Sequence, residues 1–368
     1  MSQEMKIKSE AFAQRLAAVQ KTLKERGLDG LILSGLGTGR VGDIAYLCNY
    51  RPGSARNDGF QGAGCHALAL AVEGPAMLVS PLGHFGDGLF NLGGCKASSD
   101  FSGDLAGAVR ELGLASGKLG VAGSDLMPAS VWLSLNKSLP KAELEPADDI
   151  LRGLRAVKST EEIEVLSQAA YVGEQALAKG IDAITPGVSQ RSLELALRGA
   201  AYQAGAEAIA HALVDSGPAL NGAGQGRKVQ KGDMVSLAIS GWCGGYAFSC
   251  TKVAVAGQAG QHQRDQLQHA EEAARYMVET LEPNRAVGYV TSLHGGQTIL
   301  PAVHGVGLEI FEHPWIITGP MARKPVVVPN MVICVEPILV DGELGSLPIS
   351  KTVLVTDQGP RVLGVPPA

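Results

Sequence analysis

The chain has 368 residues, of which 45% are hydrophobic and 18% are charged, and its formal net charge at pH 7 is -5. This length and composition suit two domains of ordinary size with buried cores, and they exclude wholesale disorder. Acidic and basic residues are interspersed, so no strongly basic face indicates a nucleic-acid partner.

The sequence contains no targeting or membrane signal. The N-terminal segment lacks the apolar core of a signal peptide, and no apolar run is long enough to cross a membrane. We therefore expect a cytoplasmic protein with no membrane partner. The six cysteines are scattered without a CxxC pair, which argues against a disulfide framework or a thiolate zinc site.

The first part of the chain alternates helix-like and strand-like segments. Helical spacing of apolar residues predicts a helix over residues 8–27 that ends at Gly27, and a second helix over residues 102–112. Strands are predicted at residues 30–33, 44–48, 66–72, 76–80 and 117–122. Such alternation is typical of an α/β layer domain.

Residues 51–64 have the composition of a turn and include Arg51 and Arg56. One interpretation is a solvated surface loop. The other is a lid whose arginines hold an anionic group through forked hydrogen bonds. The residues alone leave both interpretations open.

A second domain is predicted to begin after residues 145–149. Ser159 and Glu162 have the spacing of a capping box, in which each residue bonds the backbone N–H of the other at the start of a helix. Helices are expected from there to Gly180, over residues 190–203 and over residues 263–281.

Residues 232–252 form the segment around which this domain is organised. Two β-like runs, residues 234–240 and 246–255, flank a glycine-rich stretch at residues 241–245. Short apolar runs bounded by glycines predict a β hairpin, here with a five-residue connection.

The residues that frame this hairpin resemble a known family. The pairs at residues 232–233, 245–246 and 251–252 read Gly-Asp, Gly-Tyr and Thr-Lys, as in the pita-bread fold of methionine aminopeptidases, prolidases, aminopeptidase P and creatinase. The stretch HGVGLEIFEHP at residues 304–314 is similar to the family's HGxGLExHExP signature, and residues 151–163 are similar to the segment that opens its catalytic domain.

The resemblance implies an α+β fold. A pita-bread domain would occupy residues 149–368, and a smaller α/β domain similar to the N-terminal domain of creatinase would occupy residues 1–148. In relatives with this layout the N-terminal domain of one subunit often borders the active site of its neighbour, so the resemblance implies that this protein is a homodimer.

The resemblance also locates the positions at which the family's peptidases bind two metal ions. Each hairpin strand would carry an aspartate, but the matching residues are Ala238 and Ser249, and the glutamate of the last strand is replaced by Ser350. His304 and Glu336 match the remaining two ligand positions. From these replacements we expect no bound metal and no other cofactor.

Creatinase is similar in having the fold without the metal. That resemblance predicts a metal-independent hydrolase or lyase that acts on a C–N or related bond of a small polar metabolite, derived from an amino acid or similar to an amidine. His304 and Glu336 are the predicted catalytic acid–base pair. A relic hydrogen-bonded pair without catalytic use is the alternative.

The substrate is expected to be a small molecule held by neutral polar, aromatic and basic side chains. The family's pocket histidine falls on Asn221, whose amide suits binding better than proton transfer. The predicted substrate-binding residues are Asn221, Ser249, Ser350, Phe311, His211, Tyr246, Arg51 and Arg56.

Two other functions stay open at this point. The first is a catalytically inactive pita-bread protein that binds a ligand or another protein, and a collapsed apolar pocket would favour it. The second is a metal-dependent Xaa-Pro peptidase, which near-stoichiometric metal in the purified protein would favour.

Overall fold

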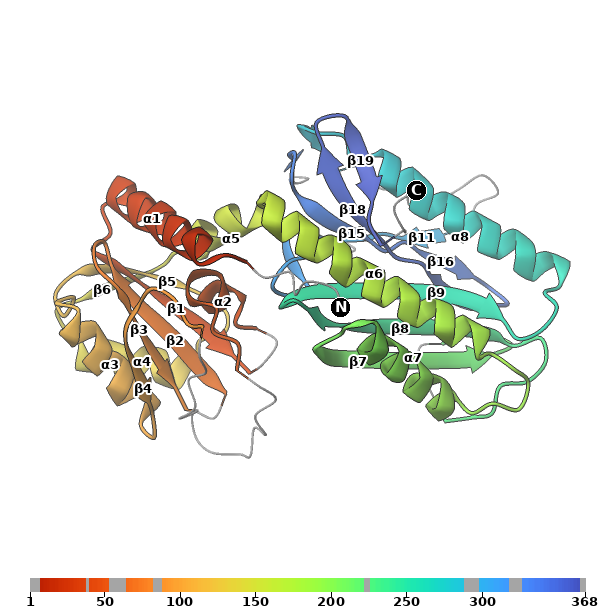
Figure 1. Cartoon of the computed structure of the whole chain (residues 1–368), viewed down its shortest axis with the longest axis horizontal. Coiled ribbons are helices and arrows are strands. Elements are labelled where there is room, and N and C mark those ends of the chain that lie inside the picture. The colour runs from red at the N-terminus through yellow and green to blue at the C-terminus, as the bar shows by residue number, and fades with distance from the viewer. Residues whose placement is uncertain are drawn as a thin grey trace. The chain divides into compact units, whose positions relative to one another are not determined.

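The computed structural model describes residues 7–37, 40–52, 64–81, 88–221, 226–287, 298–317 and 326–364. These residues form two compact units, one over residues 7–155 and the other from residue 156 onward (Figure 1). The helix Asp148–Ala156 (α5) therefore closes the first unit, one helix beyond the boundary expected from the sequence.

The first unit is a mixed sheet with helices against it. Its strands lie in the order β4-β3-β2-β1-β5-β6; the pairs β1–β2 and β2–β3 are antiparallel and the other three pairs are parallel. Besides α5, its elements are α1 Ser9–Arg26, β1 Gly30–Leu36, α2 Gly42–Cys48, β2 Cys65–Ala71, β3 Ala76–Ser80, β4 Leu92–Ala97, α3 Phe101–Glu111, β5 Lys118–Ala122, α4 Ala129–Ser138 and β6 Glu143–Pro146.

Helix α1 forms where the apolar spacing predicted it. Phe12, Val19 and Leu23 are buried, and each contributes about 1.5–3 kcal/mol of hydrophobic stabilisation. The helix ends at Gly27, whose left-handed conformation (φ 66°) lets its N–H reach the carbonyls of Leu23 and Lys24.

The strand predicted at residues 44–48 is wrong, because Gly42–Cys48 is helix α2. Ile44, Leu47 and Cys48 are fully buried. A short apolar run with no polar face is compatible with a buried strand and with a buried helix, so periodicity could not decide between them.

The second unit contains two larger sheets, β7-β8-β9 and β13-β12-β15-β18-β19, and two smaller ones, β11-β16-β17 and β10-β14. Its helices are α6 Thr160–Asp182, α7 Gln190–Ala204 and α8 Gln261–Glu279. Its strands are β7 Ala208–Gly217, β8 Met234–Cys243, β9 Tyr246–Val255, β10 Arg285–Ala286, β11 Thr298–Leu300, β12 Ala302–Gly305, β13 Glu312–Ile317, β14 Val326–Val327, β15 Val332–Val335, β16 Ile338–Asp341, β17 Gly345–Pro348, β18 Lys351–Thr356 and β19 Gly359–Val362.

Each larger sheet has a helix-covered face. One core cluster joins α6 and α7 to β7, β8 and β9, and another joins α8 to β12, β15 and β18 (Figure 1). This is the predicted α+β architecture. The predicted capping box at the start of α6 is also confirmed: Ser159 Oγ accepts from the Glu162 N–H, and the Glu162 carboxylate accepts from the Ser159 N–H.

The hairpin β8–β9 is confirmed, but its connection is shorter than predicted. Cys243 pairs with Tyr246, so Gly244 and Gly245 alone form the turn. Both have positive φ, 58° and 74°, which is the requirement of a type I′ turn and explains the Gly-Gly pair.

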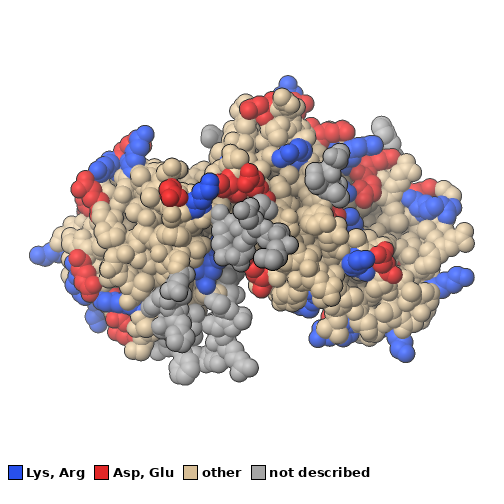
Figure 2. Space-filling model, viewed as in Figure 1, with Lys and Arg blue, Asp and Glu red and all other residues tan. Residues whose placement is uncertain are grey.

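No helix in the described ranges is long and apolar enough to cross a membrane. On the face of the molecule in Figure 2, acidic and basic side chains are interspersed among uncharged ones. The six cysteines are free thiols.

A buried polar cluster lies at the end of β2 and β3 in the first unit. The Tyr50 hydroxyl is 2.7 Å from Ser80 Oγ and 3.2 Å from His66 Nδ1, and Ser80 Oγ is 3.0 Å from the same nitrogen. All three residues are buried, and burial lowers the pKa of His66 from 6.5 to about 4.

This shift predicts an acid sensitivity of the first unit. Because the folded state binds the His66 proton less tightly than the unfolded state, stability falls as pH drops from 6.5 through about 4. In the variant His66→Gln the loss between neutral pH and pH 4 should be smaller by about 3 kcal/mol. Urea unfolding read by hydrogen–deuterium exchange of β1–β3 peptides measures this difference. His262→Gln, at a half-exposed histidine of the second unit, is the control, and equal acid sensitivity of all three proteins would contradict the prediction.

Candidate active site

The pleat of β8 and β9 determines which side chains face away from the helices. Leu237, Ile239, Phe248 and Cys250 belong to the core packed on α6 and α7. Because successive side chains of a strand point to opposite faces, the intervening residues lie on the other face. They form two cross-strand pairs, Ala238 with Thr251 and Ser240 with Ser249.

The same reasoning places His304 and Glu336. Val303, Ile333 and Val335 pack in the core with α8, so their neighbours in sequence turn away from that helix. His304 pairs with Cys334, and the Glu336 backbone exchanges two hydrogen bonds with Ala302. The two side chains are therefore diagonal neighbours on one face.

The two faces meet at Thr251. Its N–H donates to Ser350 Oγ at 2.7 Å, and its carbonyl accepts from the Ser350 N–H at 3.1 Å. Its hydroxyl donates to the Glu336 carboxylate. Both sheets thus contribute side chains to one candidate site, whose polar members are His304, Glu336, Ser249, Thr251 and Ser350.

His304 presents a hydrogen-bond acceptor to this site. Its side chain is 2% exposed, its Nδ1 lies 2.9 Å from the Gly305 carbonyl, and its Nε2 has no hydrogen-bond partner in the described part of the chain. A carbonyl can only accept, so Nδ1 carries the proton and Nε2 carries the lone pair. Burial lowers the pKa of His304, and the carbonyls of Gly305 and Ile310 and the Glu312 carboxylate partly oppose this lowering.

Glu336 is a largely desolvated carboxyl group. Burial raises its pKa, and the hydrogen bond from the Thr251 hydroxyl partly opposes that rise. The Glu336 carboxyl and the His304 ring do not hydrogen-bond to each other, since Nδ1 is used by a carbonyl and Nε2 has no partner among the described residues. Whether the two act as an acid–base pair stays a prediction.

Three of the predicted substrate-binding residues are engaged inside the protein. Ser350 Oγ receives the Thr251 N–H, and the Tyr246 hydroxyl donates to Glu162 at 2.9 Å while the ring is 1% exposed. The His211 ring lies 2.9–3.0 Å from Ser240 Oγ, and burial, with a smaller effect of Arg198, lowers its pKa.

The remaining predicted residues differ in their exposure where the structure describes them. Ser249 is buried on the site face opposite Ser240. The Phe311 ring is 54% exposed and is tilted by 46° against the His304 ring, with the ring centroids 4.3 Å apart. Asn221 is exposed, and its backbone N–H donates to the Asp215 carboxylate. Arg51 is exposed in the first unit, and Arg56 lies outside the described residues.

Two residues of the site were not predicted. Thr251, which joins the two faces, and Trp315, which pairs with His304 and is 46% exposed, were not among the candidates. Thr251 could have been found from the two-residue strand period that links it to Ser249. Trp315 pairs across a β-bulge between His304 and Gly305, which no sequence pattern indicated.

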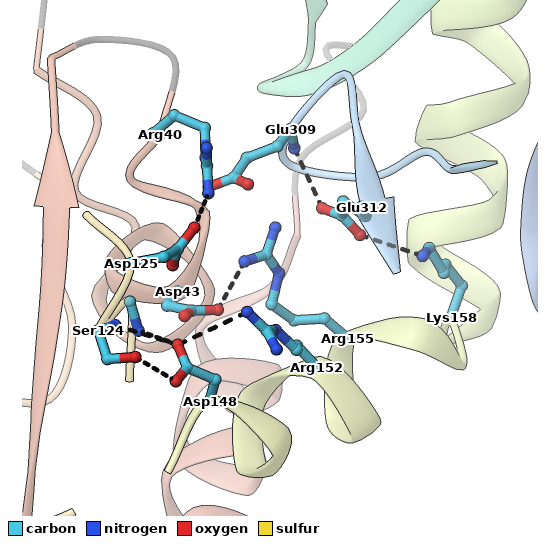
Figure 3. Close-up of polar contacts among 11 residues, drawn as sticks. Arg40, Asp43, Ser124, Asp125, Asp148, Arg152, Arg155, Lys158, Glu309 and Glu312 are labelled. Atoms are coloured by element: carbon cyan, nitrogen blue, oxygen red, sulfur yellow. Dashed lines mark hydrogen bonds and ion pairs between the residues drawn. The ribbon is translucent and has the colours of Figure 1, made fainter. Parts of the chain in front are cut away.

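A buried ion pair supports the loop that carries the signature residues (Figure 3). Lys158 Nζ lies 3.3 Å from Glu312 Oε2, with side chains 1% and 5% exposed. The other carboxylate oxygen of Glu312 accepts from the Glu309 N–H at 3.1 Å. The loop is also tied to the hairpin, since Trp242 Nε1 donates to the Leu308 carbonyl at 3.0 Å.

Comparisons with known proteins agree with this architecture. Residues 164–357 match the metallopeptidase family M24, and residues 15–157 match the creatinase/prolidase N-terminal domain. The chain therefore belongs to family M24, as the sequence resemblance predicted, with a pita-bread domain preceded by a creatinase-type N-terminal domain.

Individual relatives carry peptidase names. The chain is 29% identical to the Xaa-Pro dipeptidase of Pyrococcus furiosus over 234 residues, which are 60% of this chain and 66% of that protein. It is 26% identical to the probable dipeptidase PepE of Mycobacterium tuberculosis over 95% of this chain and 94% of the relative. The prolidase structure from Pyrococcus horikoshii OT3 superposes with a TM-score of 0.77 at 20% identity, covering 96% of this chain and 99% of that one, and shows the shared fold.

These findings correct the predicted function. The prediction of a metal-independent, creatinase-like hydrolase or lyase is wrong, because the matching relatives are named as dipeptidases and the family is one of metallopeptidases. The hydrolase part of the prediction agrees with the family. Among the functions left open by the sequence, the Xaa-Pro peptidase is the one that the relatives favour.

The residues of this chain do not fit the two-metal centre that the family name implies. In the described ranges, no three His, Cys, Asp or Glu side chains lie close enough together to hold a metal ion. Ala238 offers no donor atom, and Ser350 Oγ is already used by the Thr251 N–H. With His304 and Glu336 alone, a cation would keep mostly water ligands.

Restoring the missing carboxylates should create a metal site. In the triple variant Ala238→Asp, Ser249→Asp, Ser350→Glu we expect near-stoichiometric metal after dialysis against Mn²⁺, because four carboxylates and one imidazole then face one another. Elemental analysis of the wild type, dialysed in parallel, is the comparison. Equal metal content in the two proteins would contradict this assignment of the ligand positions.

The buried ion pair predicts a large stability effect. Lys158→Met should lower the free energy of unfolding by about 3–5 kcal/mol, because it removes the buried cation that pairs with the Glu312 carboxylate. Lys179→Met, at an exposed ion pair with a 3.9 Å separation, should change stability by less than about 1 kcal/mol. Chemical denaturation of the three proteins tests this, and similar values for both variants would show that the ion pair does not support the loop.

Proposed function

We propose that this protein recognises short peptides with proline in the second position, the substrate class named for its Xaa-Pro dipeptidase relatives. The observation that carries the proposal is sequence similarity across both units: the probable dipeptidase of Mycobacterium tuberculosis aligns with 95% of this chain and 94% of its own length. The Xaa-Pro dipeptidase of Pyrococcus furiosus adds 29% identity over 60% of the chain.

The geometry of the second unit supports a peptide ligand. The site face offers the His304 Nε2 acceptor, the Glu336 carboxylate and the Ser249 hydroxyl beside two partly exposed aromatic rings, Phe311 and Trp315. A dipeptide presents N–H donors together with an apolar pyrrolidine ring. A few placed polar groups beside aromatic surface are the usual composition of a small-ligand site.

Two outcomes of recognition are candidates. The first is cleavage of the bound peptide, which the names of the relatives favour. The second is binding without cleavage, which the ligand positions favour, because Ala238, Ser249 and Ser350 cannot supply the carboxylates with which a two-metal centre activates water.

One experiment separates these outcomes. Calorimetric titration with Ala-Pro measures binding, and chromatography of the same samples with and without Mn²⁺ or Co²⁺ measures cleavage. Pro-Ala has the same composition and charge and serves as the matched control, and we expect Ala-Pro to bind at least about tenfold more tightly. Product formation would assign cleavage, and binding without product would assign recognition alone. Equal affinities for the two peptides, or no binding of either, would overturn the proposal.

A further inference from the structure

The candidate site contains hydrogen-bond acceptor positions that no donor among the described residues fills. His304 Nε2 is buried with its lone pair free of any partner within the described residues. Glu336 receives one hydroxyl donor, from Thr251, whereas a carboxylate has about four acceptor positions. A ligand that fits this face must therefore donate hydrogen bonds.

The lysine side chains of strands β9 and β18 point away from the site face. Lys252 bonds Glu174 of α6 at 2.6 Å, and Lys351 pairs with Glu271 of α8 at 3.1 Å. Both lysines thus lie on the helix-covered sides of their sheets. Neither of these two lysines therefore lies beside the Glu336 carboxylate, which favours a cationic ligand group over an anionic one at its position.

The charge of the site also differs from that of a metal centre. The family pattern would place two aspartates, two glutamates and one histidine here, whereas this chain has one glutamate and one histidine, whose Nε2 has no hydrogen-bond partner among the described residues. Four carboxylates suit two divalent ions. One carboxylate with one neutral acceptor matches a single positive charge.

We infer that the position vacated by the metal centre binds a primary ammonium group of the ligand, held by His304 Nε2 and the Glu336 carboxylate. An ammonium group has three N–H donors and one positive charge, which satisfies both acceptors and leaves a donor for the Ser249 hydroxyl. The exposed rings of Phe311 and Trp315 beside His304 add the favourable contact that aromatic faces make with ammonium cations.

This inference rests on the proposed function for the identity of the ligand, which would be a peptide with a free N-terminus. The α-ammonium group of the peptide would take the place that a metal ion takes in a metallopeptidase. The site would then select free N-termini by charge and hydrogen bonding.

The test compares Ala-Pro with N-acetyl-Ala-Pro, which keeps the peptide but lacks the ammonium group. For the wild type we expect acetylation to weaken binding by at least about tenfold, and for Glu336→Gln we expect the two affinities to differ by less than about twofold. Glu343→Gln, the same substitution at an exposed position, should retain the wild-type ratio. Ala238→Lys, which places a tethered ammonium opposite Thr251, should also abolish the preference without removing Glu336.

A second measurement separates failure of the two proposals. Equal binding of both peptides by the wild type would leave short-peptide recognition standing and overturn the ammonium site. If neither peptide binds, the proposed function fails. The ammonium site is then tested by thermal denaturation in the presence of n-butylammonium chloride, with n-butanol as the neutral control. Stabilisation of the wild type but not of Glu336→Gln by the cation supports the site, and equal effects on the two proteins overturn it.

Discussion

The candidate site depends on one constraint, the two-residue period of strands whose other face is covered by helices. Leu237 and Ile239 are held against α6 and α7, and Ile333 and Val335 are held in the core with α8. A slip of one residue in either sheet would turn these side chains away from the helices and turn the polar ones into the apolar cores, so the hydrophobic cores determine the register. The chemistry of the site is thus positioned by residues that never touch it.

The signature loop is fixed by a second set of internal contacts. A Cβ on Gly307 would overlap the carboxylate oxygens of Glu312, so a side chain there would displace the carboxylate that pairs with Lys158. The glycine of the motif is therefore required by the ion pair. Since the Gly307 carbonyl also accepts from the Ala247 N–H at 2.7 Å, the ion pair, the glycine and the hairpin form one unit.

Local signals predicted the parts of the fold that local physics determines. The capping residues of α6, the end of α1 at Gly27 and the glycine-rich connection of the hairpin could be predicted from neighbouring residues. The extent of the turn could not, because pairing of residues 241–243 depends on partners across the strand. Helix α2 was missed because residues 44–48, which form most of it, are all apolar and buried and show no polar face.

The site was harder to predict because the polar groups of its residues form hydrogen bonds with residues that are distant in the sequence. Ser350 and Tyr246 have polar groups that suit a ligand, yet the backbone of Thr251 and the carboxylate of Glu162 occupy them. Sequence spacing does not reveal such tertiary partners. The acceptor state of His304 likewise depends on the position of the Gly305 carbonyl, which only the folded strand provides.

The side chains that determine the fold and the side chains that determine the chemistry of the site lie on opposite faces of the same strands. The helix-facing residues of β8 and β9, among them Ile239, Phe248 and Cys250, determine the fold and keep it superposable on prolidases at 20% identity. The site-facing residues Ala238 and Ser249 can change without disturbing that packing, because they contact neither α6 nor α7 through the core. A chain can therefore keep the fold of a metallopeptidase while the electrostatic character of its site changes. In this chain the neutral side chains of Ala238, Ser249 and Ser350 stand where several buried carboxylates would repel one another in the absence of a divalent cation.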